Sequence, residues 1–187
     1  HPPLFGLVSG IVYSVVGMST SAAKLTVMLF GIVFSVGVFA VARRTTGSHW
    51  LAFCSALLIV ATPQITLHFR SVWLDIPSLA SAIWVFVFYL ARLEGDRSIR
   101  NALGMVIFSV IALYIYQPTI VLLAGVFVHL MLNEWRTILK DRSIWIAAVT
   151  LAVLMLPLVV FTLSLAKDNL TITTGQIPDA WQEFDSP

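Results

Sequence analysis

Six long stretches without a charged side chain are the feature that most limits what this sequence can fold into. They lie at 1–23, 25–42, 45–69, 76–91, 101–133 and 143–166. Only 11% of the 187 residues are charged and 59% are apolar, whereas soluble domains have about 25% charged residues. This composition excludes a water-soluble globular domain and predicts an integral membrane protein.

The same stretches predict helices rather than a barrel. A helix needs roughly 20 apolar residues to cross the hydrocarbon core, and most of the stretches reach this length with their flanks. Backbone polar groups in lipid must be satisfied inside the protein, which leaves helices or a closed barrel. The run from Ile144 to Leu163 is apolar without alternation, so the strands of a barrel are excluded. We predict an all-α fold, a polytopic transmembrane helical bundle.

The basic residues predict which loops share one side of the membrane, because cytoplasmic loops accumulate Lys and Arg. Eight of the eleven Lys and Arg residues fall in three clusters, which are Arg43 and Arg44, then Arg92, Arg97 and Arg100, then Arg136, Lys140 and Arg142. If all three clusters are cytoplasmic, an even number of spans must separate each cluster from the next. The apolar stretches then form about six spans.

The longest stretch, 101–133, must cross the membrane twice. One straight helix of this length would be about 50 Å long, whereas the hydrocarbon core is about 30 Å thick. We place the break at Gln117-Pro118, because proline ends or kinks a helix and disfavours the helical conformation of the residue before it. The other predicted spans lie at 25–42, 49–67, 76–92 and 143–166.

The first stretch is expected to form a helix that lies along the outer membrane surface. Leu4 to Met18 is short for a span, contains three glycines and follows Pro2-Pro3, and proline is a normal start for a helix. A truncated transmembrane helix is the alternative. We therefore predict one domain over residues 1–187, with an interfacial helix region (1–22), a transmembrane bundle (23–166) and the start of an outer loop (167–187).

Few residues with charged or reactive side chains are left on the predicted outer face. They are His1, Lys24, His68, Arg70, Asp75, the hairpin tip from Tyr114 to Gln117, and the tail. Asp75 is the most informative, since a carboxylate at the bilayer centre costs roughly 2.5 to 3.5 kcal/mol. It can cap the helix that follows, or it can hold a metal or a substrate. Arg70 could face the same pocket, although an Arg near an interface is more often a membrane anchor.

Several other kinds of chemistry have no support in this sequence. Glycine-rich phosphate loops, paired cysteines and nucleophile elbows are absent. His49, His68 and His129 are isolated and lack the spacing of metal ligands. We therefore expect neither soluble nucleotide chemistry nor a nucleic-acid partner.

Four short motifs resemble, in order and spacing, the GT-C class of membrane glycosyltransferases. They are His1-Pro2-Pro3-Leu4, Ala42-Arg43-Arg44, Ala61-Thr62-Pro63, and Phe69-Arg70-Ser71-Val72-Trp73-Leu74-Asp75-Ile76-Pro77. The sequence is most similar to the dolichyl-phosphate-mannose protein mannosyltransferase superfamily, which includes the bacterial aminoarabinose transferases for lipid A. The resemblance covers about residues 1–135.

This resemblance implies a glycosyltransferase that moves a hexosyl or pentosyl group from a polyprenyl-phosphate donor to a protein, lipid or glycan acceptor at the outer or lumenal face. Its main catalytic carboxylate would precede the His-Pro-Pro motif, so we expect this chain to be a fragment that is inactive alone. Asp75 matches a supporting acidic position that can bind a divalent metal, the cofactor we expect. The predicted substrate-binding residues are His1, His68, Arg70, Tyr116 and Gln117.

The hairpin tip departs from the family pattern. The aminoarabinose transferases often have a Lys there, whereas this chain has Tyr114-Ile115-Tyr116-Gln117-Pro118, which predicts a different donor head group or acceptor. We expect a multi-pass protein of the bacterial inner membrane or the plasma membrane rather than the endoplasmic reticulum.

Two other functions compete with this interpretation. One is a segment of a secondary transporter or channel, and the other is an inert membrane-anchoring scaffold in which Asp75 only caps a helix. Transporters tend to place ionisable or helix-breaking residues at the midplane of the membrane. Here the charges collect at the ends of the predicted spans, which favours an enzyme that works at the membrane surface.

Overall fold

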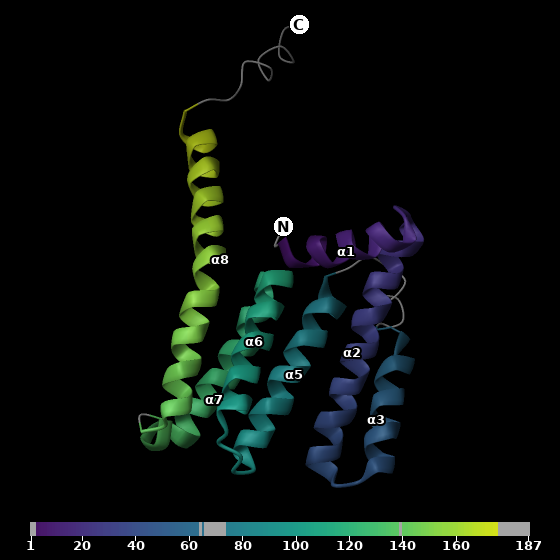
Figure 1. Cartoon of the computed structure of the whole chain (residues 1–187), viewed down its shortest axis with the longest axis vertical. Helices are drawn as coiled ribbons and strands as arrows, with labels where there is room; N and C mark the ends of the chain where they lie inside the picture. The colour runs from purple at the N-terminus through teal and green to yellow at the C-terminus, as the bar shows by residue number, and fades with distance from the viewer. Residues whose placement is uncertain (1–2, 64, 66–73, 139, 176–187) are drawn as a thin grey trace, which may run out of the picture. The chain divides into compact units, whose positions relative to one another are not determined.

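A computed structural model describes residues 3–63, 65, 74–138 and 140–175 of the chain, and the described part contains helices and no strand. The helices are α1 (Pro3–Val16), α2 (Thr20–Thr46), α3 (His49–Ala61), α5 (Asp75–Leu93), α6 (Ile99–Ile115), the 3-10 helix η1 (Gln117–Thr119), α7 (Ile120–Ile138) and α8 (Arg142–Gly175) (Figure 1). The predicted all-α helical bundle is therefore confirmed.

The chain divides into two compact units, His1–Leu151 and Ala152–Pro187. The boundary falls inside α8. The first unit contains α1 to α7 and the start of α8. The predicted single domain over residues 1–187, with its three regions, stays a prediction.

Short local signals set the helix ends. The hydroxyl of Ser19 accepts a hydrogen bond from the N–H of Ala22 at 3.1 Å, and the hydroxyl of Ser48 accepts one from Leu51 at 3.4 Å. Such serines satisfy backbone donors that the first turn of a helix leaves unpaired. Gly47 ends α2 at φ +69°, a left-handed conformation that glycine adopts without a steric penalty.

Three of the predicted spans match helices that are long and apolar enough to cross a membrane. The predicted spans 25–42 and 76–92 correspond to α2 and α5, and the span 143–166 corresponds to the stretch Arg142–Ser164 of α8. The predicted hairpin is also present, because α6 ends at Ile115 and η1 separates it from α7. These helices confirm a membrane protein.

The predicted span 49–67 is wrong in length, because α3 ends at Ala61. Pro63 follows, and proline disfavours the helical conformation of the residue before it. Thr62 accordingly has φ −63° and ψ 125°, which is extended backbone. Together with α6 and the η1–α7 segment, α3 belongs to the shorter apolar helices of the described chain.

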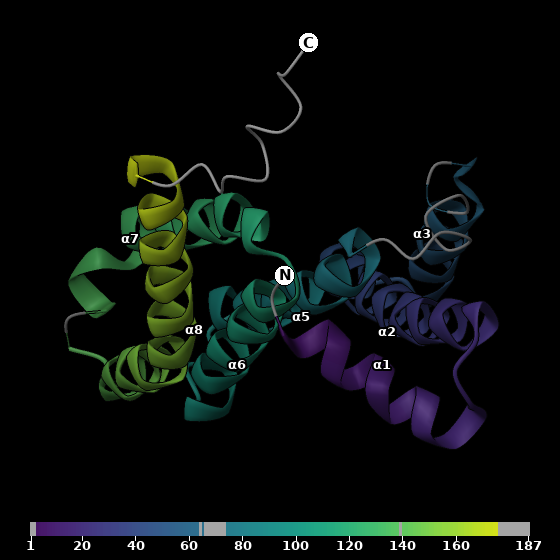
Figure 2. The same cartoon turned by 90° about the horizontal axis from the view of Figure 1, so that it is seen from above.

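The first helix, α1, runs across the direction of α2 instead of alongside it (Figures 1 and 2). It contacts α2 and α6, and Gly17 at φ +88° forms the turn that leads into α2. Leu7, Ile11 and Val15 of α1 are exposed. A crosswise helix with exposed apolar side chains has the orientation that a membrane surface requires. Its position at the outer surface stays a prediction.

The central helix of the first unit is α5, which contacts α2, α6 and α7. One apolar cluster joins it to α2 through the buried residues Phe34, Val38 and Ala80. A second cluster joins it to α7 through the buried residues Val85, Tyr89, Val126 and Leu130. Both halves of α5 are therefore held in place by neighbouring helices.

Candidate functional site

A cavity of about 330 Å³ lies where the start of α5 meets the turn between α6 and α7. Its lining residues are Ile65, Asp75, Ile76, Ser78, Leu79, Tyr116, Pro118, Thr119 and Leu122. Pockets for small molecules typically measure roughly 300–1,000 Å³ and combine apolar walls with a few polar groups. This cavity has that character and is the candidate site.

Asp75 is the first residue of α5, and Leu74 occupies the N-cap position. The interpretation of Asp75 as the cap of this helix is therefore wrong. A carboxylate in the first turn is still favourable, because the N-terminus of a helix carries a partial positive charge. Asp75 is half-buried, so the start of α5 places a carboxylate beside the cavity.

A buried hydrogen bond holds the two walls of the cavity together. The hydroxyls of Ser78 on α5 and Thr119 on η1 bond to each other, and these residues are only 1% and 8% exposed. Ser78 lies three residues after Asp75, so both side chains share one face of α5. Sequence analysis missed this pair, although a serine in register with Asp75 and a threonine directly after Pro118 were its available signals.

The turn itself directs Tyr116 to the cavity. The N–H of Tyr116 donates to the carbonyl of Ala112 at 2.9 Å, and the carbonyl of Tyr116 accepts from the N–H of Thr119 at 3.2 Å. The residue has extended backbone (φ −154°, ψ 106°) and ends α6. Tyr116 is thus fixed at the cavity by hydrogen bonds of its own turn.

The structure brings together two of the predicted site residues, Asp75 and Tyr116. Gln117 is exposed and follows Tyr116, but it is not among the lining residues of the cavity. The other three predicted residues, His1, His68 and Arg70, lie outside the described part of the chain. Their roles, and that of Gln117, stay predictions.

The described residues contain no group of three or more His, Cys, Asp or Glu that could hold a metal ion. The described lining of the cavity offers the Asp75 carboxylate and the hydroxyls of Ser78, Tyr116 and Thr119. Mg²⁺ is often held by one or two carboxylates, with substrate phosphates and water completing its coordination. The Asp75 carboxylate is the charged donor among these groups, and the predicted divalent metal at Asp75 stays a prediction.

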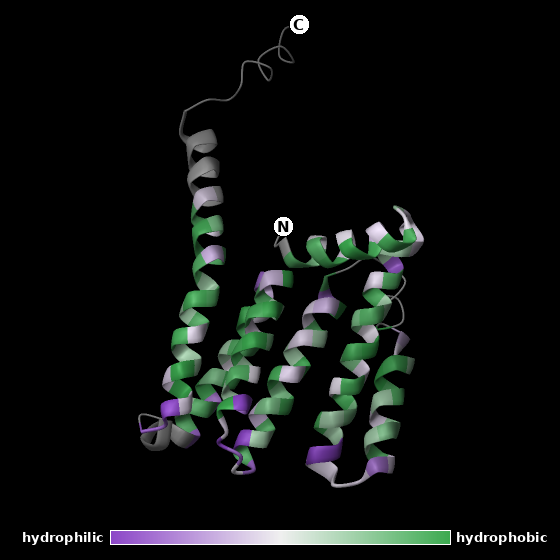
Figure 3. Ribbon diagram, in the orientation of Figure 1, coloured by the Kyte–Doolittle hydropathy of each residue, from purple (hydrophilic) through white to green (hydrophobic). Residues whose placement is uncertain are grey.

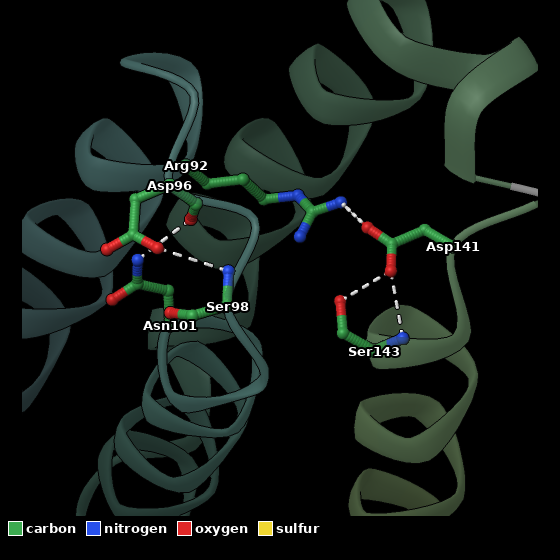
Figure 4. Close-up of polar contacts among 6 residues, drawn as sticks. All are labelled: Arg92, Asp96, Ser98, Asn101, Asp141 and Ser143. Carbon is green, nitrogen blue, oxygen red and sulfur yellow. Dashed lines mark hydrogen bonds and ion pairs between the residues drawn. The ribbon is translucent and has the colours of Figure 1, made fainter.

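The opposite end of α5 carries a buried ion pair (Figure 4). Arg92 Nη2 lies 2.5 Å from Asp141 Oδ2, and the two side chains are 1% and 14% exposed. The other oxygen of Asp141 accepts hydrogen bonds from the N–H and the hydroxyl of Ser143 at 2.8 and 2.7 Å. Burial alone would raise the pKa of Asp141, but the hydrogen bonds from Ser143 and Arg92 and the Arg92 charge outweigh it and lower this pKa.

Two further polar contacts occupy the same end. Arg44 Nη1 lies 2.6 Å from Glu94 Oε2 and joins the ends of α2 and α5. In the loop between α5 and α6, hydrogen bonds from Ser98 and then Asn101 lower the pKa of Asp96. Figure 3 shows hydrophilic residues gathered where α2 ends and between α5 and α6.

The cavity and the basic residues therefore lie at opposite ends of one helix. Asp75 and Arg92 are separated by 17 residues of α5, which corresponds to about 26 Å of helix. The hydrocarbon core of a bilayer is about 30 Å thick. This spacing agrees with the sequence prediction that Asp75 and the basic clusters are on different sides of a membrane; which side each faces stays a prediction.

The model of the family described as dolichyl-phosphate-mannose-protein mannosyltransferase matches residues 1–161 of the chain. The match contains the cavity and both ends of α5. No curated protein and no solved structure matches the chain.

Proposed function

Because the chain belongs to the dolichyl-phosphate-mannose-protein mannosyltransferase family, we propose that it serves the transfer of a sugar from a polyprenyl-phosphate donor to an acceptor at the outer or lumenal membrane face. Membership itself indicates a membrane glycosyltransferase of the GT-C type. One structural observation links the proposal to particular residues. Asp75 and Tyr116, 41 residues apart, line one cavity at the end of α5 that lacks the basic clusters.

The chemistry of the proposed reaction determines which groups the cavity must provide. A nucleophilic atom of the acceptor bonds to the anomeric carbon of the sugar, and the bond from that carbon to the phosphate oxygen breaks with its electron pair. Negative charge then develops on the departing polyprenyl phosphate, and groups that stabilise this charge accelerate the reaction. A divalent cation held at Asp75 would supply such stabilisation when bound.

Asp75 has a supporting role in this proposal. Its carboxylate orients the acceptor or holds the cation, while a different carboxylate takes the proton of the acceptor. The hydroxyls of Tyr116 and Thr119 suit hydrogen bonds to the sugar. The apolar walls from Ile76, Leu79 and Leu122 suit the first units of the prenyl chain.

A transporter or channel segment is the competing function, and α5 argues against it. This helix is the most buried of the three long apolar helices, and its charged residues, Asp75 and Arg92, lie at its two ends. Segments that conduct ions or substrates tend to carry ionisable groups near the midplane. The placement of charge favours a site at the membrane surface. We further propose that the membrane is a bacterial inner membrane or a plasma membrane.

The replacement Asp75→Asn in the full-length protein tests the proposal. We expect the rate of sugar transfer from a polyprenyl-phosphate donor to fall at least 100-fold, which is about 2.7 kcal/mol in activation free energy. Protein level in the membrane and the unfolding temperature should stay near native, because asparagine has the same size and shape as Asp75, which lines the cavity.

Asp96→Asn is the matched control, since Asp96 is also a carboxylate at an end of α5 but lies away from the cavity. It should keep a native rate of transfer. A native rate in Asp75→Asn would remove Asp75 from the site, and an equal loss in both variants would show that the effect is not specific to the cavity.

A further inference from the structure

A second cavity, of about 590 Å³, lies between α2 and α5 near the ends that carry basic residues. On α2 it is lined first by Val36, Phe39 and Ala40 and then by Arg43 and Arg44. These residues are spaced three, four and seven apart, so they lie on one face of the helix. The opposite wall includes Val87 of α5 and Glu94, the C-cap residue that follows this helix.

The lining of this cavity changes from apolar to charged along the helices. From Val36 to Arg43 the rise of α2 is about 10 Å. Val36 is 49% exposed and the end of the cavity at Arg43 and Arg44 is also exposed, so the cavity is open to the surroundings of the helix pair along its length. An occupant with a charged head and an apolar tail matches this arrangement.

The charged end has a surplus of positive charge among the described lining residues. Arg44 and Glu94 form an ion pair at 2.6 Å, which neutralises one arginine. Arg43 is exposed, and its guanidinium makes no hydrogen bond or ion pair with any residue in the described part of the chain. The cavity thus keeps one cation that can receive an anion.

We propose that this cavity binds an anionic phospholipid of the surrounding bilayer, with the lipid phosphate at Arg43 and an acyl chain along Val36 and Phe39. The planar guanidinium matches the geometry of phosphate oxygens. Basic pockets between transmembrane helices are known sites for anionic head groups. The site lies at the end of α5 away from Asp75, so it is independent of the proposed sugar-transfer site.

Native mass spectrometry of the full chain in a neutral detergent tests this assignment, with phosphatidylglycerol and phosphatidylcholine as probes. The native protein should hold phosphatidylglycerol at least fivefold more tightly than phosphatidylcholine. Arg43→Gln should lower the affinity for phosphatidylglycerol about fivefold, to the level of phosphatidylcholine, because the anion loses its cation. Glu94→Gln should raise this affinity, because it frees Arg44 from its ion pair.

Arg100→Gln is the matched control, since it removes one exposed positive charge near the same helix ends without touching the cavity. It should bind phosphatidylglycerol as the native protein does. An unchanged affinity in Arg43→Gln, or equal binding of both lipids by the native protein, would overturn the proposal. Millimolar inorganic phosphate should leave the lipid bound, because phosphate cannot use the apolar wall; complete displacement would assign the site to free phosphate and overturn the lipid.

Discussion

The two ends of α5 use charged residues differently. At the C-terminal end, Arg92 is buried and paired with Asp141, and Glu94 is paired with Arg44, so charges join this end to the residue before α8 and to α2. At the N-terminal end, Asp75 lies beside a cavity whose walls are joined by neutral hydroxyls. A charged residue near a membrane surface therefore does not by itself mark a functional site. The adjoining cavity is what makes Asp75 a candidate binding residue.

This comparison predicts its largest effect on stability at Asp141. Asp141→Asn should lower the free energy of unfolding by about 3 kcal/mol, because the buried guanidinium of Arg92 loses the ionised carboxylate that lies 2.5 Å from it. Thermal unfolding in detergent, followed by intrinsic fluorescence, measures the change.

Glu94→Gln is the control for this replacement, because the Arg44–Glu94 pair at the same end is exposed, with side chains 36% and 50% accessible. Exposed pairs contribute about 0–1 kcal/mol. Equal losses in the two variants would contradict the view that burial makes the Arg92–Asp141 pair important at this end.

The next largest effect is expected at Gly37 of α2, which packs against Ile83 between the two ends of α5. A Cβ added there would overlap the branched side chain of Ile83 on α5, so Gly37→Ala should cost about 1–3 kcal/mol through overpacking. Gly125 in α7 has no atom within 4 Å of an added Cβ, and Gly125→Ala should be neutral or stabilising, since alanine favours helices. Unfolding temperatures of both variants would decide whether α2 and α5 pack as closely as described.

A smaller effect is expected at the cavity end. Ser78→Ala should lower stability by about 1 kcal/mol, because the buried hydroxyl of Thr119 loses its partner. Transfer activity should fall several-fold, since this bond holds the turn that carries Tyr116. The double replacement Ser78→Ala with Thr119→Val should cost less than the sum of the single changes. Strict additivity of the two losses would show that these hydroxyls do not interact.

The smallest expected effect is a dependence of the unfolding temperature on acid pH, caused by Asp141. The pKa of Asp141 lies below its ordinary value of 3.8 in the folded chain, so folding favours its ionised form. This stabilisation is fully present above the unfolded pKa and is lost as the pH falls through the folded pKa. The difference in unfolding temperature between the native protein and Asp141→Asn should hold at neutral pH and shrink below about pH 4. A constant difference down to about pH 3 would contradict this assignment.

Most helix boundaries could be predicted because their causes are local. Uncharged stretches, the proline after Gln117 and the clustered arginines placed α5, the α6–α7 turn and the start of α8 within one or two residues and α2 within five. The end of α8 lies at Gly175, nine residues beyond the predicted span. The end of α3 was misplaced because the apolar pattern continues past Pro63, and the pattern was given more weight than the proline. Local backbone preference decided that end.

The candidate site was predictable only in part. Asp75 and Tyr116 could be chosen because a carboxylate and a hairpin tip stand out among apolar spans. The signals for Ser78 and Thr119 were too weak to select them, because a hydroxyl in an apolar helix usually bonds to its own backbone, as Thr26 does to the carbonyl of Ala22. Only the packing of α5 against η1 turns these two hydroxyls toward each other.

The sequence by itself determined that this is a membrane protein, in which order its helices follow, and at which end of the bundle basic residues collect. Hydrophobicity, proline and charge act within a few residues, so their consequences can be read along the chain. Tertiary structure alone decided that Asp75 and Tyr116 share a cavity. It also decided that Arg92 pairs with Asp141, whereas Arg43 borders the second cavity. These outcomes depend on which helix faces pack together, and that choice is made by side-chain contacts between segments about 40 or more residues apart.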